Sequence, residues 1–294
     1  MIRILVSLLI LCLALPAAAA EPIDQAGWNA RKQTALLSNG LRMAYVEYGN
    51  PDGPPVLLLH GYTDSSRSWT LVAPHLADFR LLIPDQRGHG ASDKPRCCYS
   101  TGIIADDARL FLDALNVERA AVVGHSLGSM VAQALAAEHP GRVSSLVLVG
   151  STALVPVKRG DWLWTNVAAL GEPIDRRSEF LREWNPANAP TPVDASFAAA
   201  AMEEILAVPL HVWKGVIREL ADIPVARPAA DVRQPVLVLS GGKDSLFPAE
   251  HHHALLAAYP QALGQVFPDL GHNLIWERPD AVAAPIRSFL AAQP

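Results

Sequence analysis

Short, continuous apolar runs recur along the chain and are separated by segments with a helical period. Five of the runs predict buried strands, at Val56–Leu59, Leu81–Pro84, Ala120–Val123, Leu146–Val149 and Val236–Leu239. Their apolar residues do not alternate with polar ones, which is typical of parallel strands covered on both faces. Between them, Ile103–Leu115 repeats apolar residues about once per turn, and Ser126–Glu138 is rich in Ala and Leu. This alternation of strands and helices predicts an α/β fold with a mostly parallel, doubly wound sheet.

Two stretches depart from this pattern. Leu41–Tyr48 alternates in polarity, which predicts an antiparallel edge strand. From about Thr152 to Arg233 no strand is evident, and two helical stretches are predicted near Val193–Ile205 and Leu210–Leu220. This segment is also rich in tryptophan, and buried aromatic rings mostly serve packing. The sheet pattern resumes only at Val236, so we interpret the segment as an insertion.

The first twenty residues have the pattern of a secretory signal. Arg3 supplies the positive charge, Ile4–Leu15 forms an apolar stretch, and Ala18 and Ala20 occupy the small positions of a cleavage site. The apolar stretch is shorter than the roughly 20 residues that a membrane span requires. We therefore expect residues 1–20 to be removed, which leaves a periplasmic or secreted protein without a stable membrane span.

Composition and charge narrow the possible functions. Hydrophobic residues make up 50% of the chain, and the length suits one α/β domain with an insertion. The formal net charge is −5, and loss of Arg3 with the signal makes it more negative. Nucleic-acid binding is not expected, because it requires a basic face. Beyond the signal the only cysteines are Cys97 and Cys98. They could form a vicinal disulfide or remain thiols, and the sequence leaves both open.

The most informative motif is Gly124-His125-Ser126-Leu127-Gly128. It follows a predicted strand and precedes a predicted helix, which is the context of a nucleophile elbow. In such an elbow, the serine hydroxyl is exposed on a sharp turn, and the flanking glycines allow the strand and the helix to approach closely. The alternative is that Ser126 only caps the helix. The two glycines and the partners described next favour a nucleophile.

Two candidate partners follow in the order acid, then histidine. Asp244 lies just past the strand Val236–Leu239, and His272 follows the last predicted strand of the sheet, Gln265–Phe267. A serine hydroxyl needs an adjacent base, and the base needs a group that holds its tautomer, so we expect His272 as base and Asp244 as its partner. The other carboxylates considered for this role occur at less suitable positions, namely Asp231, Asp269 and Glu277.

An oxyanion hole is predicted from two backbone N–H groups. The N–H of Leu127, directly after the serine, is one donor. The other is the N–H of Tyr62, in the His60-Gly61-Tyr62 segment that follows the strand Val56–Leu59. The Tyr62 side chain could face the substrate or pack against the pocket wall.

These motifs resemble the α/β-hydrolase superfamily, and within it the small bacterial serine esterases and the non-haem chloroperoxidase-like group. The resemblance runs from about Leu41 to Leu290 and includes the segment Asp85–Ser92. It implies an α/β-hydrolase core in residues 21–151 and 234–294, with residues 152–233 as a helical cap over the active site. It also implies the catalytic residues Ser126, Asp244 and His272.

The expected function is hydrolysis of a small-to-medium carboxylic ester with an apolar portion, through an acyl-enzyme. Hydrolysis of a lactone or a carbon–carbon bond by the same triad is the alternative, and a receptor-like member with little turnover is a third possibility. No cofactor is expected, because the sequence contains no phosphate-binding Gly-rich loop. No metal is expected either, and we interpret His251-His252-His253 as a solvated face. The substrate and the oligomeric state are left open.

Overall fold

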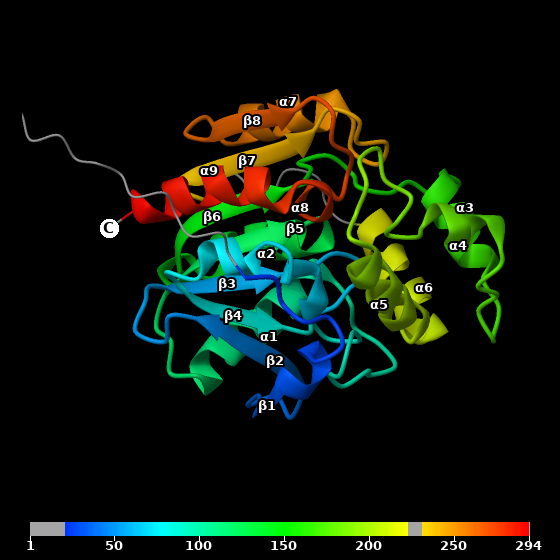
Figure 1. The fold of residues 1–294 in the computed structure, drawn as a ribbon, viewed down its shortest axis with the longest axis horizontal. Coiled ribbons are helices and arrows are strands. Elements are labelled where there is room, and N and C mark those ends of the chain that lie inside the picture. The colour runs from blue at the N-terminus through cyan, green and yellow to red at the C-terminus, as the bar shows by residue number, and fades with distance from the viewer. Residues whose placement is uncertain (1–20, 223–230, 294) are drawn as a thin grey trace, which may run out of the picture.

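A single eight-stranded sheet organises the computed structural model, which describes residues 21–222 and 231–293 (Figure 1). The strand order is β1-β2-β4-β3-β5-β6-β7-β8. The strands are β1 (Gln33–Leu36), β2 (Arg42–Gly49), β3 (Pro55–Leu59), β4 (Arg80–Pro84), β5 (Ala120–His125), β6 (Val143–Val149), β7 (Val236–Gly241) and β8 (Leu263–Phe267). From β4 to β8 all neighbours pair in parallel, whereas β2 is antiparallel to both β1 and β4. The prediction of an α/β fold with a mostly parallel sheet is therefore confirmed.

Helices cover both faces of the sheet, as the continuous apolar strands require. Alternate residues of one strand enter different cores: Leu57 and Leu59 pack on one face, and Val56 and Leu58 on the other. The first face is covered by α1 (Thr101–Ala114), α2 (Leu127–Glu138) and α7 (Ala249–Ala258). The second face is covered by α8 (Leu274–Glu277) and α9 (Pro279–Ala291), together with the short 3-10 helices η2 (Ser66–Trp69) and η3 (Ala73–Leu76).

One strand prediction was wrong in its position. Leu41–Tyr48 was expected at the edge of the sheet, but the corresponding strand β2 lies between β1 and β4. The edge strand on that side is β1, four residues long, of which only Ala35 is buried. So few buried positions leave no apolar pattern in the sequence, which is why β1 was not predicted.

The segment between β6 and β7 contains helices and no strand within its described part. They are α3 (Trp162–Ala169), α4 (Glu179–Glu183), α5 (Ala195–Leu206) and α6 (Leu210–Ala221). Figure 1 shows all four gathered beyond one end of the sheet, and we call residues 152–222 the cap segment. The rest of the predicted insertion includes residues 223–230, which lie outside the described residues, as does the predicted signal at 1–20.

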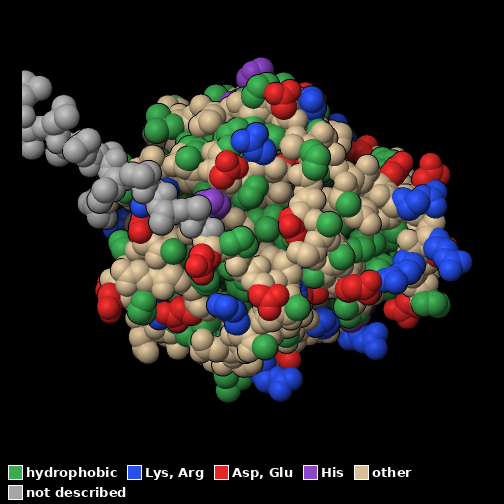
Figure 2. Space-filling view, in the orientation of Figure 1, with side chains coloured by type: hydrophobic (Ala, Val, Ile, Leu, Met, Phe, Trp, Pro, Cys, Tyr) green, Lys and Arg blue, Asp and Glu red, His purple; other side chains and the backbone are tan. Residues whose placement is uncertain are grey.

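Helix hydropathy and the distribution of surface charge bear on whether the protein could bind a membrane or a charged partner. Among the described residues no single helix is long and apolar enough to cross a membrane, and only the bent pair α5 and α6 passes that test together, by length and composition. Acidic and basic side chains are interspersed over the face seen in Figure 2.

Candidate active site

Ser126 occupies a strained turn between β5 and α2. Its φ is 51° and its ψ is −118°, a conformation that non-glycine residues seldom adopt. The Ser126 N–H donates to the Val149 carbonyl, which ties the turn to β6. A Cβ on Gly124 would lie 2.3 Å from the Gly128 oxygen, and one on Gly128 would lie 2.2 Å from the Leu59 oxygen. Both glycines are therefore required by the close approach of helix and strands.

The structure brings the three predicted catalytic side chains into one hydrogen-bonded chain. Ser126 Oγ lies 2.9 Å from His272 Nε2, and His272 Nδ1 lies 2.8 Å from Asp244 Oδ2. The second oxygen of Asp244 accepts hydrogen bonds from the N–H groups of Leu246 and Phe247. Asp244 therefore has both oxygens engaged, and its orientation toward His272 is held by the loop that follows β7.

The electrostatics of the pair favour a charged carboxylate and a basic imidazole. Burial by itself would raise the pKa of Asp244, but His272 and the amides of Leu246 and Phe247 hold that pKa below its usual value. Burial would lower the pKa of His272, but the charge of Asp244 and its hydrogen bond raise that pKa above its usual value. Asp244 can therefore stabilise an imidazolium that forms when His272 takes a proton from Ser126.

Both residues that carry the predicted oxyanion donors line the pocket around Ser126. Among the backbone hydrogen bonds that turns, loops and helix caps make within residues 21–222 and 231–293, none has the Tyr62 N–H or the Leu127 N–H as donor. Leu127 is the first residue of α2, where an N–H has no partner within the helix. The loop that carries Tyr62 is held by His60, whose Nδ1 faces the Gly61 oxygen and whose Nε2 accepts from the Gln86 N–H. Burial lowers the pKa of His60 to about 3, so the ring is neutral and can accept that bond.

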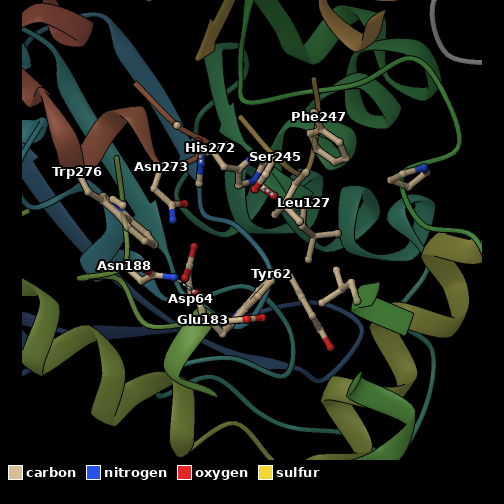
Figure 3. A pocket seen from close by; sticks show the side chains of 18 of the residues that line it. Tyr62, Asp64, Leu127, Glu183, Asn188, Ser245, Phe247, His272, Asn273 and Trp276 are labelled. Atoms are coloured by element: carbon tan, nitrogen blue, oxygen red, sulfur yellow. Dashed lines mark hydrogen bonds between the residues drawn. The ribbon is translucent and has the colours of Figure 1, made fainter. Parts of the chain in front are cut away.

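A pocket of about 660 Å³ opens over Ser126 and His272 and is lined by both the core and the cap segment. Its apolar lining residues include Leu127, Met130, Val157, Leu163 and Phe247. Figure 3 shows Asp64, Glu183 and Asn188 close together on the side away from Phe247. The pocket can therefore hold a substrate with one apolar and one polar portion.

Sequence reasoning missed Asp64 as part of this pocket. Its side chain is buried beside the catalytic centre, and a Cβ on Gly61 would lie 2.7 Å from Asp64 Oδ2 and 3.3 Å from Ser126 Cβ. Burial raises the pKa of Asp64 to about 7. The residue lies in a polar loop segment, and no local pattern distinguishes it from a solvent-exposed aspartate.

The histidine tract was misinterpreted as a solvated face. His252 is buried and its Nδ1 lies 2.9 Å from Ser240 Oγ. The Nδ1 of His251 lies 2.6 Å from Thr152 Oγ1, so this ring links α7 to the start of the cap segment. Within the described residues no group of three or more His, Cys, Asp or Glu side chains could hold a metal ion. The error arose because α7 buries one side against β7, and a run of identical residues does not show which side that is.

The two cysteines form a vicinal disulfide in the structure. Cys97 and Cys98 are bonded through their Sγ atoms, and both residues are exposed in the loop that precedes α1. Neither lines the pocket. The disulfide is therefore separate from the site around Ser126.

The fold and the elbow define an α/β hydrolase, and comparison with known proteins agrees. The chain belongs to the alpha/beta hydrolase fold family, whose model matches residues 54–279. It is 31% identical to 2-hydroxymuconate semialdehyde hydrolase of Pseudomonas sp., over 87% of this chain and 93% of that protein. It is 29% identical to Lipase 1 of Psychrobacter immobilis, over 89% and 85% of the two chains. An esterase of known structure from Rhodococcus sp. superposes with a TM-score of 0.77 at 25% identity, covering 90% of this chain and all of that one.

Proposed function

We propose that this protein is a serine hydrolase that cleaves a small-to-medium carboxylic ester through an acyl-enzyme. The observation that carries the proposal is the chain from Ser126 Oγ through His272 to Asp244, at 2.9 and 2.8 Å, at the base of the pocket. Both distances are within reach for proton transfer and orientation. The lipase and the esterase to which the chain is similar support the ester as substrate class.

In the proposed reaction, His272 Nε2 removes the proton of Ser126 Oγ as that oxygen attacks the ester carbonyl. The N–H groups of Tyr62 and Leu127 donate to the oxyanion of the tetrahedral intermediate. His272 then returns its proton to the departing alcohol, and the acyl group stays on Ser126. A water molecule, deprotonated by His272, attacks the acyl-enzyme and releases the carboxylic acid.

One alternative reaction is favoured by a specific observation. The similarity to 2-hydroxymuconate semialdehyde hydrolase makes cleavage of a carbon–carbon bond by the same residues the second candidate. In the polar part of the pocket wall, the Asn188 amide can donate to a carbonyl or carboxylate that such a substrate carries besides the reacting group. The lipid-like acyl chain of a lipase substrate instead requires the apolar wall near Leu127 and Phe247.

The test is turnover of aryl esters of increasing acyl length by the chain beginning at Glu21, compared with Ser126→Ala. Ser145→Ala is the matched control, because Ser145 is a buried serine on β6 that does not line the pocket. We expect Ser126→Ala to abolish turnover and Ser145→Ala to retain it. Absence of ester turnover by folded wild-type protein, with hydrolysis of 2-hydroxymuconate semialdehyde, would replace the ester proposal with carbon–carbon bond cleavage.

We also propose that the protein is exported and acts in the periplasm or outside the cell. The proposal rests on the signal-like pattern of residues 1–20. The vicinal disulfide is compatible with an oxidising compartment. Fractionation of cells expressing the full chain, followed by N-terminal sequencing, should find protein that begins at Glu21 outside the cytoplasm. An uncleaved N-terminus in the cytoplasmic fraction would refute the proposal.

A further inference from the structure

Two hydrogen bonds join the loop that carries the Tyr62 N–H to the cap segment. The indole Nε1 of Trp184, at the end of α4, donates to Thr63 Oγ1 at 2.9 Å. The Tyr62 hydroxyl donates to the backbone oxygen of Trp213, on α6, at 2.7 Å. Both bonds lie in a mostly buried region, where an unpaired donor or acceptor would be costly.

The bond from Trp184 continues toward the backbone of the loop. Thr63 Oγ1 accepts from the indole N–H and itself donates to the Tyr62 carbonyl oxygen at 2.6 Å. The N–H of the same peptide unit, which belongs to Thr63, donates to His89 Nε2 at 3.3 Å. The peptide unit directly after Tyr62 is thus held from both sides, once by the cap segment and once by the core.

The backbone at this point needs such support. Thr63 has a φ of 65°, and a β-branched residue in this left-handed region is an outlier. Conformations of this kind persist where surrounding contacts determine them, and they are concentrated at functional sites. The Thr63 side chain is completely buried, so its hydroxyl has no solvent to replace the indole as a donor.

Trp184 also contacts the space that a substrate would occupy. Its ring lies 5.8 Å from the Tyr62 ring and 6.3 Å from the Trp213 ring, and it lines the pocket. The Trp184 side chain therefore lines the pocket with its ring, and its indole nitrogen holds the loop that carries Tyr62, which we call the oxyanion loop.

We propose that Trp184 is a positioning residue for the reaction, because its indole N–H holds Thr63 and thereby aims the Tyr62 N–H at the oxyanion. On this proposal the cap segment holds one of the two oxyanion donors in place in addition to shaping the pocket. The inference rests on the proposed serine-hydrolase function. It predicts that loss of the indole N–H lowers transition-state stabilisation more than it weakens substrate binding.

The first experiment compares Trp184→Phe with Trp162→Phe. Both variants keep an aromatic ring in the same cluster, and the described contacts give Trp162 no hydrogen bond through its indole. Loss of a whole oxyanion donor lowers kcat by about 10²–10³-fold, so misalignment of one donor should lower kcat by about 10-fold. We expect Trp184→Phe to show that loss with KM within about twofold, and Trp162→Phe to change KM only. The rate at which an alkyl fluorophosphonate labels Ser126 should fall in parallel with kcat.

Variants of Thr63 test the path independently. Thr63→Ser keeps the hydroxyl and should retain near-wild-type kcat, whereas Thr63→Ala should lose about as much as Trp184→Phe. The double variant should be no worse than Thr63→Ala alone, because the indole then has nothing to hold. Thermal unfolding confirms that each variant is folded.

Two results would overturn the inference while the proposed function stands. One is a Trp184→Phe variant whose loss is confined to KM, as in Trp162→Phe. The other is additive losses in the double variant. Wild-type protein that neither turns over esters nor is labelled at Ser126 would instead refute the proposed function itself.

Discussion

The close approach of α2 to β3 makes Gly128→Ala a sharp test of how the proposed nucleophile, Ser126, is held. Gly128 is the second residue of α2, two positions after Ser126 and one after the proposed donor Leu127. A Cβ at this position would lie 2.2 Å from the Leu59 oxygen and 2.5 Å from the His60 oxygen. Both contacts are with backbone atoms, which cannot rotate away as a flexible side chain can.

The size of the effect follows from these distances. Real Cβ atoms essentially never approach closer than 3.0 Å, so α2 and the end of β3 must separate by about 0.8 Å. The displaced segment carries the Ser126 turn and the Leu127 N–H, and a misplacement of about 1 Å can cost about 10²-fold in rate. We therefore expect kcat/KM to fall about 100-fold. Overpacking should cost about 1–3 kcal/mol, partly offset by about 1 kcal/mol because alanine favours helix more than glycine.

The assay is ester turnover, together with urea unfolding of the same preparation. Gly141→Ala is the control, since nothing lies within 4 Å of the position that its Cβ would take. It should leave kcat/KM and the unfolding midpoint close to wild type. A Gly128→Ala variant with wild-type kcat/KM would show that the close approach does not position the nucleophile, and the reasoning would be wrong.

Three further predictions test the charges around the site. Asp244→Asn should lower kcat about 10⁴-fold, since an amide cannot hold the His272 tautomer. It should also move the rising limb of the kcat/KM–pH profile to lower pH, because the carboxylate raises the pKa of His272. A rising limb at the wild-type pH would contradict this prediction. Because burial raises the pKa of Asp64 to about 7, ionisation of this side chain opposes folding. The free energy of unfolding should therefore fall as the pH rises from about 4 to about 7, by about 4 kcal/mol at most. Asp64→Asn should remove this pH dependence, measured by urea unfolding at pH 5 and at pH 8. An identical pH dependence in the variant would refute the assignment. Glu204→Ala leaves the buried Arg67 without its carboxylate and should cost about 3–5 kcal/mol in urea unfolding, whereas a loss below 1 kcal/mol would show that the pair is not effectively buried.

The core strands could be predicted because their signal is local. Five runs of apolar residues correspond to β3, β4, β5, β6 and β7, each of which packs on both faces. The antiparallel side of the sheet was harder to predict from the sequence, because β1 is short and mostly exposed. The alternation of apolar and polar residues in β2 indicates that its two faces are covered differently, but it does not indicate whether another strand pairs with its free edge.

The clustering of the candidate site residues at the carboxyl ends of β3, β5 and β7 could also be predicted from the sequence. The elbow and the oxyanion loop directly follow strands that the sequence locates, and parallel strands end at the same edge of the sheet. Ser126, Tyr62 and Asp244 are thereby placed close together by connectivity. His272 follows β8, and the structure places it between Ser126 and Asp244.

Helices α5 and α6 of the cap segment were predicted from the sequence, but the contacts that the segment makes with the core were not, because those contacts are tertiary. Trp184 and Thr63 are 121 positions apart, and Tyr62 and Trp213 are 151 apart. No periodicity in the chain pairs them, and four tryptophans in one insertion are equally consistent with simple packing. The reacting groups depend on strand ends that many members of a fold share, whereas the shape of the pocket and the support of its oxyanion loop depend on which cap side chains meet the core. Membership of the hydrolase fold family could therefore be predicted from the sequence, whereas the substrate could not. For the same reason, a change at Trp184 should alter kcat although Trp184 is distant along the chain from each proposed catalytic residue.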